Sequence, residues 1–147
     1  MRRVFFLAAM VLVLARAGSF DAAGQLDKKR VVRAFLAKEN DIKPRSMFSE
    51  DEPVIYLIWK SEHFRAGDEI RVIWIAEDVG DASPKDTKIN EGSTVVYKSE
   101  DHGTISLSRP NSRLWPIGRY RAEIFLDRQF VQTLRFTIQS RVNVELN

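Results

Sequence analysis

The sequence predicts an all-β fold, an antiparallel β-sandwich of about seven strands that follows a cleaved export signal. Short runs rich in Val, Ile, Phe, Tyr and Trp recur along the chain from residue 31 onward. Residues that favour turns interrupt these runs at intervals typical of a sandwich or a barrel. No segment of this part has the 3.6-residue apolar period of a convincing amphipathic helix.

Seven segments carry the strand pattern: residues 31–37, 53–60, 70–76, 94–98, 104–108, 120–126 and 130–138. In the third segment every second residue from Ile70 to Ala76 is apolar, which makes Trp74 the expected core anchor. The stretches 39–52 and 78–92 are rich in acidic and turn-forming residues and are expected to be loops. This number of short strands in about 110 residues is typical of an immunoglobulin-like sandwich.

The amino terminus has the three parts of a secretory signal peptide. Residues 1–3 are positively charged at Arg2 and Arg3, residues 4–14 form an unbroken apolar run, and residues 15–17 offer small side chains for cleavage. The apolar run is shorter than the roughly 20 residues of a membrane-spanning helix. We therefore expect cleavage before Gly18, export to the periplasm or the extracellular space, and no stable membrane anchor.

The chain divides into four expected parts. They are a signal peptide at 1–17, a flexible leader at 18–30, one sandwich domain at 31–140 and a carboxy-terminal tail at 141–147. About 130 residues remain after cleavage, enough for a single domain with its own hydrophobic core.

The composition excludes several kinds of site and partner. The chain has no cysteine, which excludes a disulfide framework, a lipid-modified cysteine anchor and a thiolate metal site. The arginines at positions 2, 3 and 16 leave with the signal, so Lys+Arg falls from 23 to 20 and equals the 20 acidic residues. A formally neutral domain argues against nucleic acid as a partner.

The charge is nonetheless uneven along the chain. Residues 39–101 hold fifteen acids and eight bases, whereas residues 104–147 hold seven arginines and three acids. This distribution fits either two recognition faces of opposite charge or the solvated outer sides of two sheets.

The carboxy-terminal part carries a recognisable motif. Residues 115–127 read W-P-I-G-R-Y-R-A-E-I-F-L-D, and residues 130–138 read F-V-Q-T-L-R-F-T-I. This order resembles the last hairpin of many bacterial exported Ig-like domains, although Arg128 stands where those domains have a glycine. The resemblance implies structural roles for Gly118 and for Tyr120, whose hydroxyl would return to the upstream backbone as a tyrosine corner. It covers roughly residues 53–138 and includes Trp74 as the core tryptophan of the domain.

No group of residues predicts a catalytic or metal site. Both histidines, His63 and His102, fall in expected turns without a visible third ligand or an orienting partner. Asp78, Asp81 and Asp86 share one expected loop, but their spacing does not follow a calcium-binding loop, so calcium is the weaker alternative there. We therefore expect a protein that is not an enzyme and that takes no cofactor or metal.

The candidate binding surface combines the expected loop at 78–92 with the connection around Trp115. Its residues are Trp115, Asp81, Lys85, Asp86 and Lys88. Long loops without secondary structure are uncommon in compact domains and are often functional. Aromatic residues at strand spacing are more often core than exposed, and Trp115, which lies close to proline and glycine, is the best candidate for a semi-exposed contact.

Together these features predict an exported, non-enzymatic Ig-like module that binds another protein or serves as an accessory subunit of an envelope assembly. Two alternatives stay open. A carbohydrate-binding module would present Trp115 and Trp59 on an exposed face. A small exported enzyme inhibitor is the other, whereas an enzyme would need a pocket with side chains of perturbed pKa.

Overall fold

The computed structural model describes residues 29–39, 41–109, 111 and 113–144. The expected signal peptide and nearly all of the expected leader lie outside these residues. None of the described helices is long and apolar enough to cross a membrane. The elements, in chain order, are β1 (Val31–Lys38), β2 (Met47–Ser49), β3 (Val54–Glu62), β4 (Glu69–Asp78), the 3₁₀ turn η1 (Gly80–Ala82), β5 (Thr87–Val95), β6 (Asp101–Ser108), β7 (Gly118–Leu126), β8 (Gln129–Gln139) and α1 (Arg141–Val144).

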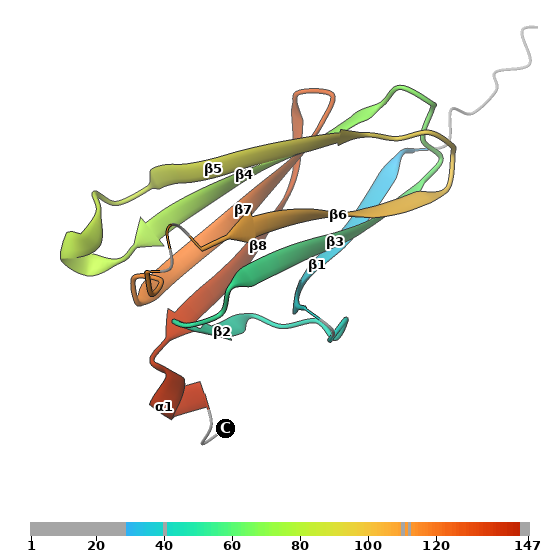
Figure 1. Cartoon of the computed structure of the whole chain (residues 1–147). Helices are drawn as coiled ribbons and strands as arrows, with labels where there is room; N and C mark the ends of the chain where they lie inside the picture. Colours follow the sequence, from blue (N-terminus) through green and yellow to red (C-terminus); the bar gives the residue numbers. More distant parts are fainter. Residues whose placement is uncertain (1–28, 40, 110, 112, 145–147) are drawn as a thin grey trace, which may run out of the picture.

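The strands form two sheets that face each other (Figure 1). One sheet has the order β1-β3-β6 and the other the order β2-β8-β7-β4-β5. Neighbouring strands are antiparallel except for β2, which runs parallel to β8. In immunoglobulin lettering the sheets are A-B-E and A′-G-F-C-C′, where the first strand is divided between the two sheets. The predicted all-β immunoglobulin-like sandwich is therefore confirmed.

Strand β2 lies in the stretch 39–52 that was expected to be a loop, so the described domain has eight strands and not seven. It consists of three residues, Met47 to Ser49, which is too few to show an alternating pattern. Its partners are Thr137 to Gln139 of β8, about 90 residues further along the chain. Pairing with a distant strand, rather than local sequence preference, creates this element.

The expected loop at 78–92 is wrong in its second half, because β5 begins at Thr87. The expected strand at 94–98 is also wrong in its bounds, since β5 ends at Val95. Strand β5 reads T-K-I-N-E-G-S-T-V and pairs with β4 along its whole length. It lies at the edge of the sheet and most of its side chains are exposed, so it lacks the apolar alternation that marks half-buried strands.

An aromatic cluster holds the centre of the core. Trp74 and Tyr120 are 0% and 1% exposed and are the largest fully buried side chains. Both contact Phe136 of β8, with ring centroids 6.2 Å apart for Trp74 and 5.3 Å apart for Tyr120. Phe48 of β2 approaches the same ring at 5.7 Å. The location of Trp74 on β4, an interior strand of the larger sheet, agrees with the anchor role expected for it.

The last hairpin closes with two residues, although Arg128 replaces a glycine. Asp127 and Arg128 have φ angles of +45° and +73°, the positive values that a type I′ turn requires. Asp127 holds this turn in place because its carboxylate accepts a hydrogen bond of 2.8 Å from the backbone N–H of Glu69. The expected tail beyond residue 140 begins with the short helix α1.

Candidate functional site

The uneven charge of the sequence cancels in three dimensions. Arg121 on β7 donates to Glu77 at 3.4 Å, to Glu123 at 2.8 Å and to Asp86. Arg119 bonds to Asp78 at 3.1 Å, and Arg135 to Glu77 at 3.2 Å. The hydrogen bonds from Arg121 to Asp86 and Glu123 raise the pKa of that guanidinium, so its charge is fixed. The acidic and basic segments thus meet on one sheet, which disfavours two recognition faces of opposite charge.

The structure does not bring the four charged candidate residues together with Trp115. Asp86 pairs with Arg121, Lys85 with Asp78 at 3.4 Å, and Lys88 with Glu91. Asp81 is exposed on η1. These side chains occupy the outer surface of the turn and of β5, and their binding role stays a prediction.

Trp115 is 4% exposed, so it belongs to the core and is not the semi-exposed contact for which it was the best candidate. Its indole Nε1–H donates to the carbonyl of Glu52 at 2.7 Å, and its backbone N–H donates to the carbonyl of Glu50 at 2.8 Å. These bonds tie it to the segment after β2, the strand that the sequence pattern did not reveal. Trp59 is also buried, at 3% exposure, so neither tryptophan lies on the exposed face that the carbohydrate-binding alternative requires.

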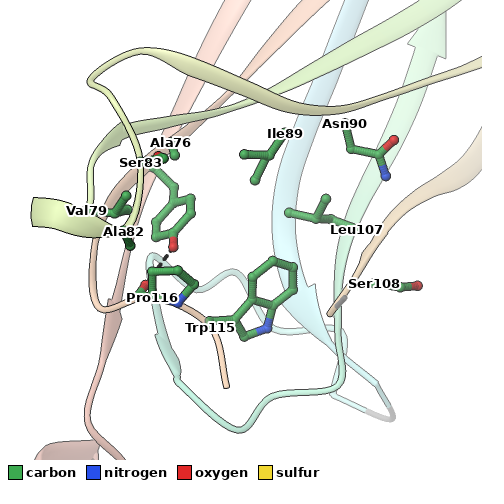
Figure 2. A pocket seen from close by; sticks show the side chains of 11 residues that line it. Ala76, Val79, Ala82, Ser83, Ile89, Asn90, Leu107, Ser108, Trp115 and Pro116 are labelled. Carbon is green, nitrogen blue, oxygen red and sulfur yellow. Dashed lines mark hydrogen bonds between the residues drawn. The ribbon is translucent and has the colours of Figure 1, made fainter. Parts of the chain in front are cut away.

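A cavity of about 250 Å³ opens where β5 and β6 diverge at one end of the sandwich. Its lining residues, shown in Figure 2, come from both sheets and from the turn after β4: Ala76, Val79, Ala82, Ser83, Ile89, Asn90, Leu107, Ser108, Trp115, Pro116 and Tyr120. The side chains of Ile89, Leu107 and Trp115 point toward the same space. The turn after β4 and the Trp115 connection, which the sequence grouped as one candidate surface, therefore meet at this cavity.

Tyr120 forms part of the cavity wall, and its hydroxyl group has a hydrogen-bond partner within the protein. Its hydroxyl donates to the carbonyl of Pro116 at 2.6 Å, four residues upstream, as the corner interpretation expects. Burial raises the pKa of Tyr120 to about 12, so the hydroxyl stays protonated at neutral pH and keeps this hydrogen bond. The hydrogen bond therefore holds the Tyr120 ring in a fixed position in the wall.

Gly118 allows the turn beside the cavity to lie against the start of β7. Its φ angle is +151°, and a Cβ atom at this position would lie 2.3 Å from the carbonyl oxygen of Asp78 and 2.9 Å from the Cα of Val79. Only glycine fits without displacement of this backbone. Since Val79 lines the cavity, the expected structural role of Gly118 includes shaping it.

The lining of the cavity is mostly apolar. Its lining residues include no acidic, basic or histidine side chain, and hydroxyl and amide groups come from Ser83, Asn90 and Ser108. Within the described part of the chain, no three His, Asp or Glu residues converge in a way that could hold a metal ion. His63 and His102 are both exposed. Sequence reasoning missed the cavity, although Ile89, an exposed apolar residue in a polar stretch, was a signal for it.

Comparison with known proteins shows similarity of fold and no shared family. No protein-family model and no curated protein matches the chain. A mutant β-glucosidase from Listeria innocua in complex with laminaribiose is similar at a TM-score of 0.52 and 10% identity, over 76% of this chain and 16% of that chain. An immunoglobulin-like protein from Pseudomonas aeruginosa gives a TM-score of 0.48 and 9% identity, over 78% of this chain and 99% of that chain. The chain thus spans a small part of the glucosidase, and at these identities the likeness is one of fold alone.

Proposed function

We propose that this chain is an exported, non-enzymatic immunoglobulin-like module that binds another protein, as an accessory subunit of an envelope assembly. The observation that carries the proposal is the apolar cavity between the diverging edges of the two sheets. At about 250 Å³ it is smaller than the sites of roughly 300–1,000 Å³ that enclose small-molecule ligands. It exceeds the engineered cavity of about 150 Å³ that holds benzene. This size suits one large apolar side chain supplied by a protein partner.

The lining of the cavity supports binding in preference to catalysis. A general acid, a general base or a nucleophile needs an ionisable or activated side chain at the reacting atoms. Tyr120 is the one lining residue with an ionisable side chain, and its hydroxyl donates a hydrogen bond to the carbonyl of Pro116. Ser83 and Ser108 have no histidine or carboxylate beside them in the cavity wall that could activate them.

Export is proposed from the signal-like residues 1–17. The expected result is a processed protein in the periplasm or the medium whose intact mass corresponds to a chain beginning at or near Gly18. Recovery of a stable species that still carries the apolar run 4–14 would contradict cleavage and favour an anchored protein.

Binding can be tested by affinity capture from envelope fractions with a substitution at the cavity. Ala82 is exposed on η1 and lines the cavity, so Ala82→Glu places a carboxylate beside an apolar occupant. Burying that charge without a partner is costly, and capture should fall roughly tenfold or more. The matched control is Ala66→Glu, which changes an exposed alanine in the turn before β4.

Both variants should melt at the temperature of the parent, because both positions are exposed. Equal capture by Ala82→Glu and by the parent would remove the cavity from the binding site. If the captured protein is a hydrolase that the domain inhibits, the module is an enzyme inhibitor. Failure to retain any envelope protein at stoichiometric yield would contradict protein binding altogether.

A further inference from the structure

We propose that the outer edge of β6 accepts an extended, uncharged segment of the partner protein as an added strand, and that one large apolar side chain of this segment fills the cavity. The inference rests on the proposed protein-binding function and specifies its site and the chemistry of its partner. It is carried by a comparison of the sheet edges and by the position of the cavity beside one of them.

Three of the four sheet edges carry features that prevent strand addition. The edges belong to β1 and β6 in one sheet and to β2 and β5 in the other. Strand β2 has only three residues. Strand β1 carries Arg33 and Lys38, and β5 carries Lys88 and Glu91. Very short edge strands and charged side chains are the usual protection of an exposed edge against pairing with another chain.

Strand β6 lacks this protection. It has eight residues, and the seven from His102 to Ser108 include no Lys, Arg, Asp, Glu or Pro. The one acid, Asp101, is at the start of the strand, and its carboxylate accepts hydrogen bonds from the backbone N–H groups of Tyr97 and His102 at 3.0 Å. In the described part of the chain β6 pairs with β3 alone. Its outer edge therefore presents backbone donors and acceptors without a neighbouring strand.

This edge leads directly into the cavity. Gly92 of β5 lies close to Ile105 of β6, since a Cβ on Gly92 would be 2.8 Å from the Ile105 Cγ2 atom. The two sheets thus meet at this point. Toward Leu107 and Ile89 they diverge, and both residues line the cavity that opens there (Figure 2).

The direction of the side chains connects an added strand with the cavity. Leu107 is 2% exposed and faces the interior, whereas the neighbouring Ser106 and Ser108 are exposed. In paired strands, residues directly opposite each other point to the same face of the sheet. The residue of an added strand that lies opposite Leu107 would therefore direct its side chain inward, into the cavity.

The chemistry of the edge and cavity defines the occupant. A charged side chain at the inward position would lose its hydration, and no lining residue carries an opposite charge to compensate. An aromatic or large aliphatic side chain would gain contact with Trp115 and Leu107. Backbone hydrogen bonds to β6 would supply affinity and the cavity would supply selectivity, as in other cases of strand addition.

A second copy of this chain is a poorer occupant of the same site. Pairing of two β6 edges would bring Ile105 and Leu107 of each copy to the interface. These side chains are 7% and 2% exposed because they belong to the core of their own sandwich. The inward side chains of the second copy already pack in its own core, so none of them could fill the cavity of the first copy.

The test uses the mature domain and two capped synthetic peptides of the same length as β6, which is eight residues. Both alternate valine and threonine, and one inward position is phenylalanine in the first peptide and aspartate in the second. The phenylalanine peptide should slow hydrogen exchange of alternate β6 amides and shift the indole N–H resonance of Trp115. The aspartate peptide should do neither. Slowed exchange on β1 or β5 in place of β6, equal effects of both peptides, or no effect of either would overturn strand addition.

A pair of edge variants separates this inference from the proposed function. Ser106→Lys adds a charge to the exposed face of β6, and Ser93→Lys makes the same change on β5. Ser106→Lys should weaken both peptide binding and partner capture roughly tenfold, and Ser93→Lys should leave both unchanged. If the partner is captured equally by both variants, protein binding stands and strand addition is refuted. Concentration-dependent dimerisation that Ser106→Lys abolishes would assign the edge to a second copy and overturn the proposal.

Discussion

Replacing Trp74 with alanine should lower the free energy of unfolding by about 3–5 kcal/mol. The indole is fully buried on β4, between the neighbouring strands β5 and β7, and its ring packs edge-on against Phe136. Its removal leaves a large cavity at the junction of the aromatic cluster. A domain of this size has about 5–15 kcal/mol of stability in total, so the loss should be visible as a large shift of the urea midpoint.

Two further substitutions make this result specific. Tyr97→Ala removes an aromatic side chain that is 80% exposed and should change the urea midpoint little. Trp74→Phe should cost less than Trp74→Ala, because both variants lose the indole Nε1–H, which is buried without a hydrogen-bond partner, but the phenyl ring leaves a much smaller cavity. A Trp74→Ala protein that unfolds at the parent's midpoint would be incompatible with the burial of Trp74 on an interior strand.

Replacing Gly118 with alanine should destabilise the domain by about 3 kcal/mol or more, the sum of backbone strain and steric overlap. The strain comes from its φ angle of +151°, and the overlap from a Cβ placed 2.3 Å from the Asp78 carbonyl oxygen. Relief of this contact would push the turn after β4 away from β7. Chemical denaturation gives the change in free energy, and the tryptophan fluorescence of the native protein reports displacement around Trp115.

Gly67→Ala is the matched control for this substitution. Gly67 also has a positive φ angle, +99°, but a Cβ there would meet nothing within 4 Å. The control should therefore show the strain alone, about 1 kcal/mol. Equal losses in the two variants would mean that the close approach to Asp78 contributes nothing.

The interior strands β4 and β7 could be predicted from the sequence because apolar, buried side chains recur at every second position. The apolar series that includes Trp74 on β4 and Tyr120 on β7 identifies two neighbouring strands of the larger sheet. The two edge strands β2 and β5 could not be predicted in the same way. The first is too short for any pattern, and the second is polar because its side chains face solvent. Both exist through pairing with strands whose position depends on the whole fold.

The turn after β4 and the Trp115 connection, which the sequence grouped as one candidate surface, both contribute residues to the cavity. Of the five candidate residues only Trp115 lines it, and the binding role of the others stays a prediction. The sequence left the burial of Trp115 open, because the hydrogen bonds that hold it come from carbonyl groups of Glu50 and Glu52, which β2 brings into position. Apolar residues such as Ile89 and Leu107 become a cavity only where two sheets diverge, and a linear pattern carries no information on that divergence.

The parallel pairing of β2 with β8 has a consequence for the order of folding. The backbone N–H of Glu50 donates to the carbonyl of Gln139 at 2.9 Å, and the carbonyl of Glu50 in turn accepts from Trp115. The wall of the cavity is thus attached to the last strand of the domain through a segment near its beginning. Contacts between such distant parts of a chain form late, because closing a long loop costs entropy before any contact compensates it. The wall of the cavity therefore becomes complete only when β8 has paired with β2.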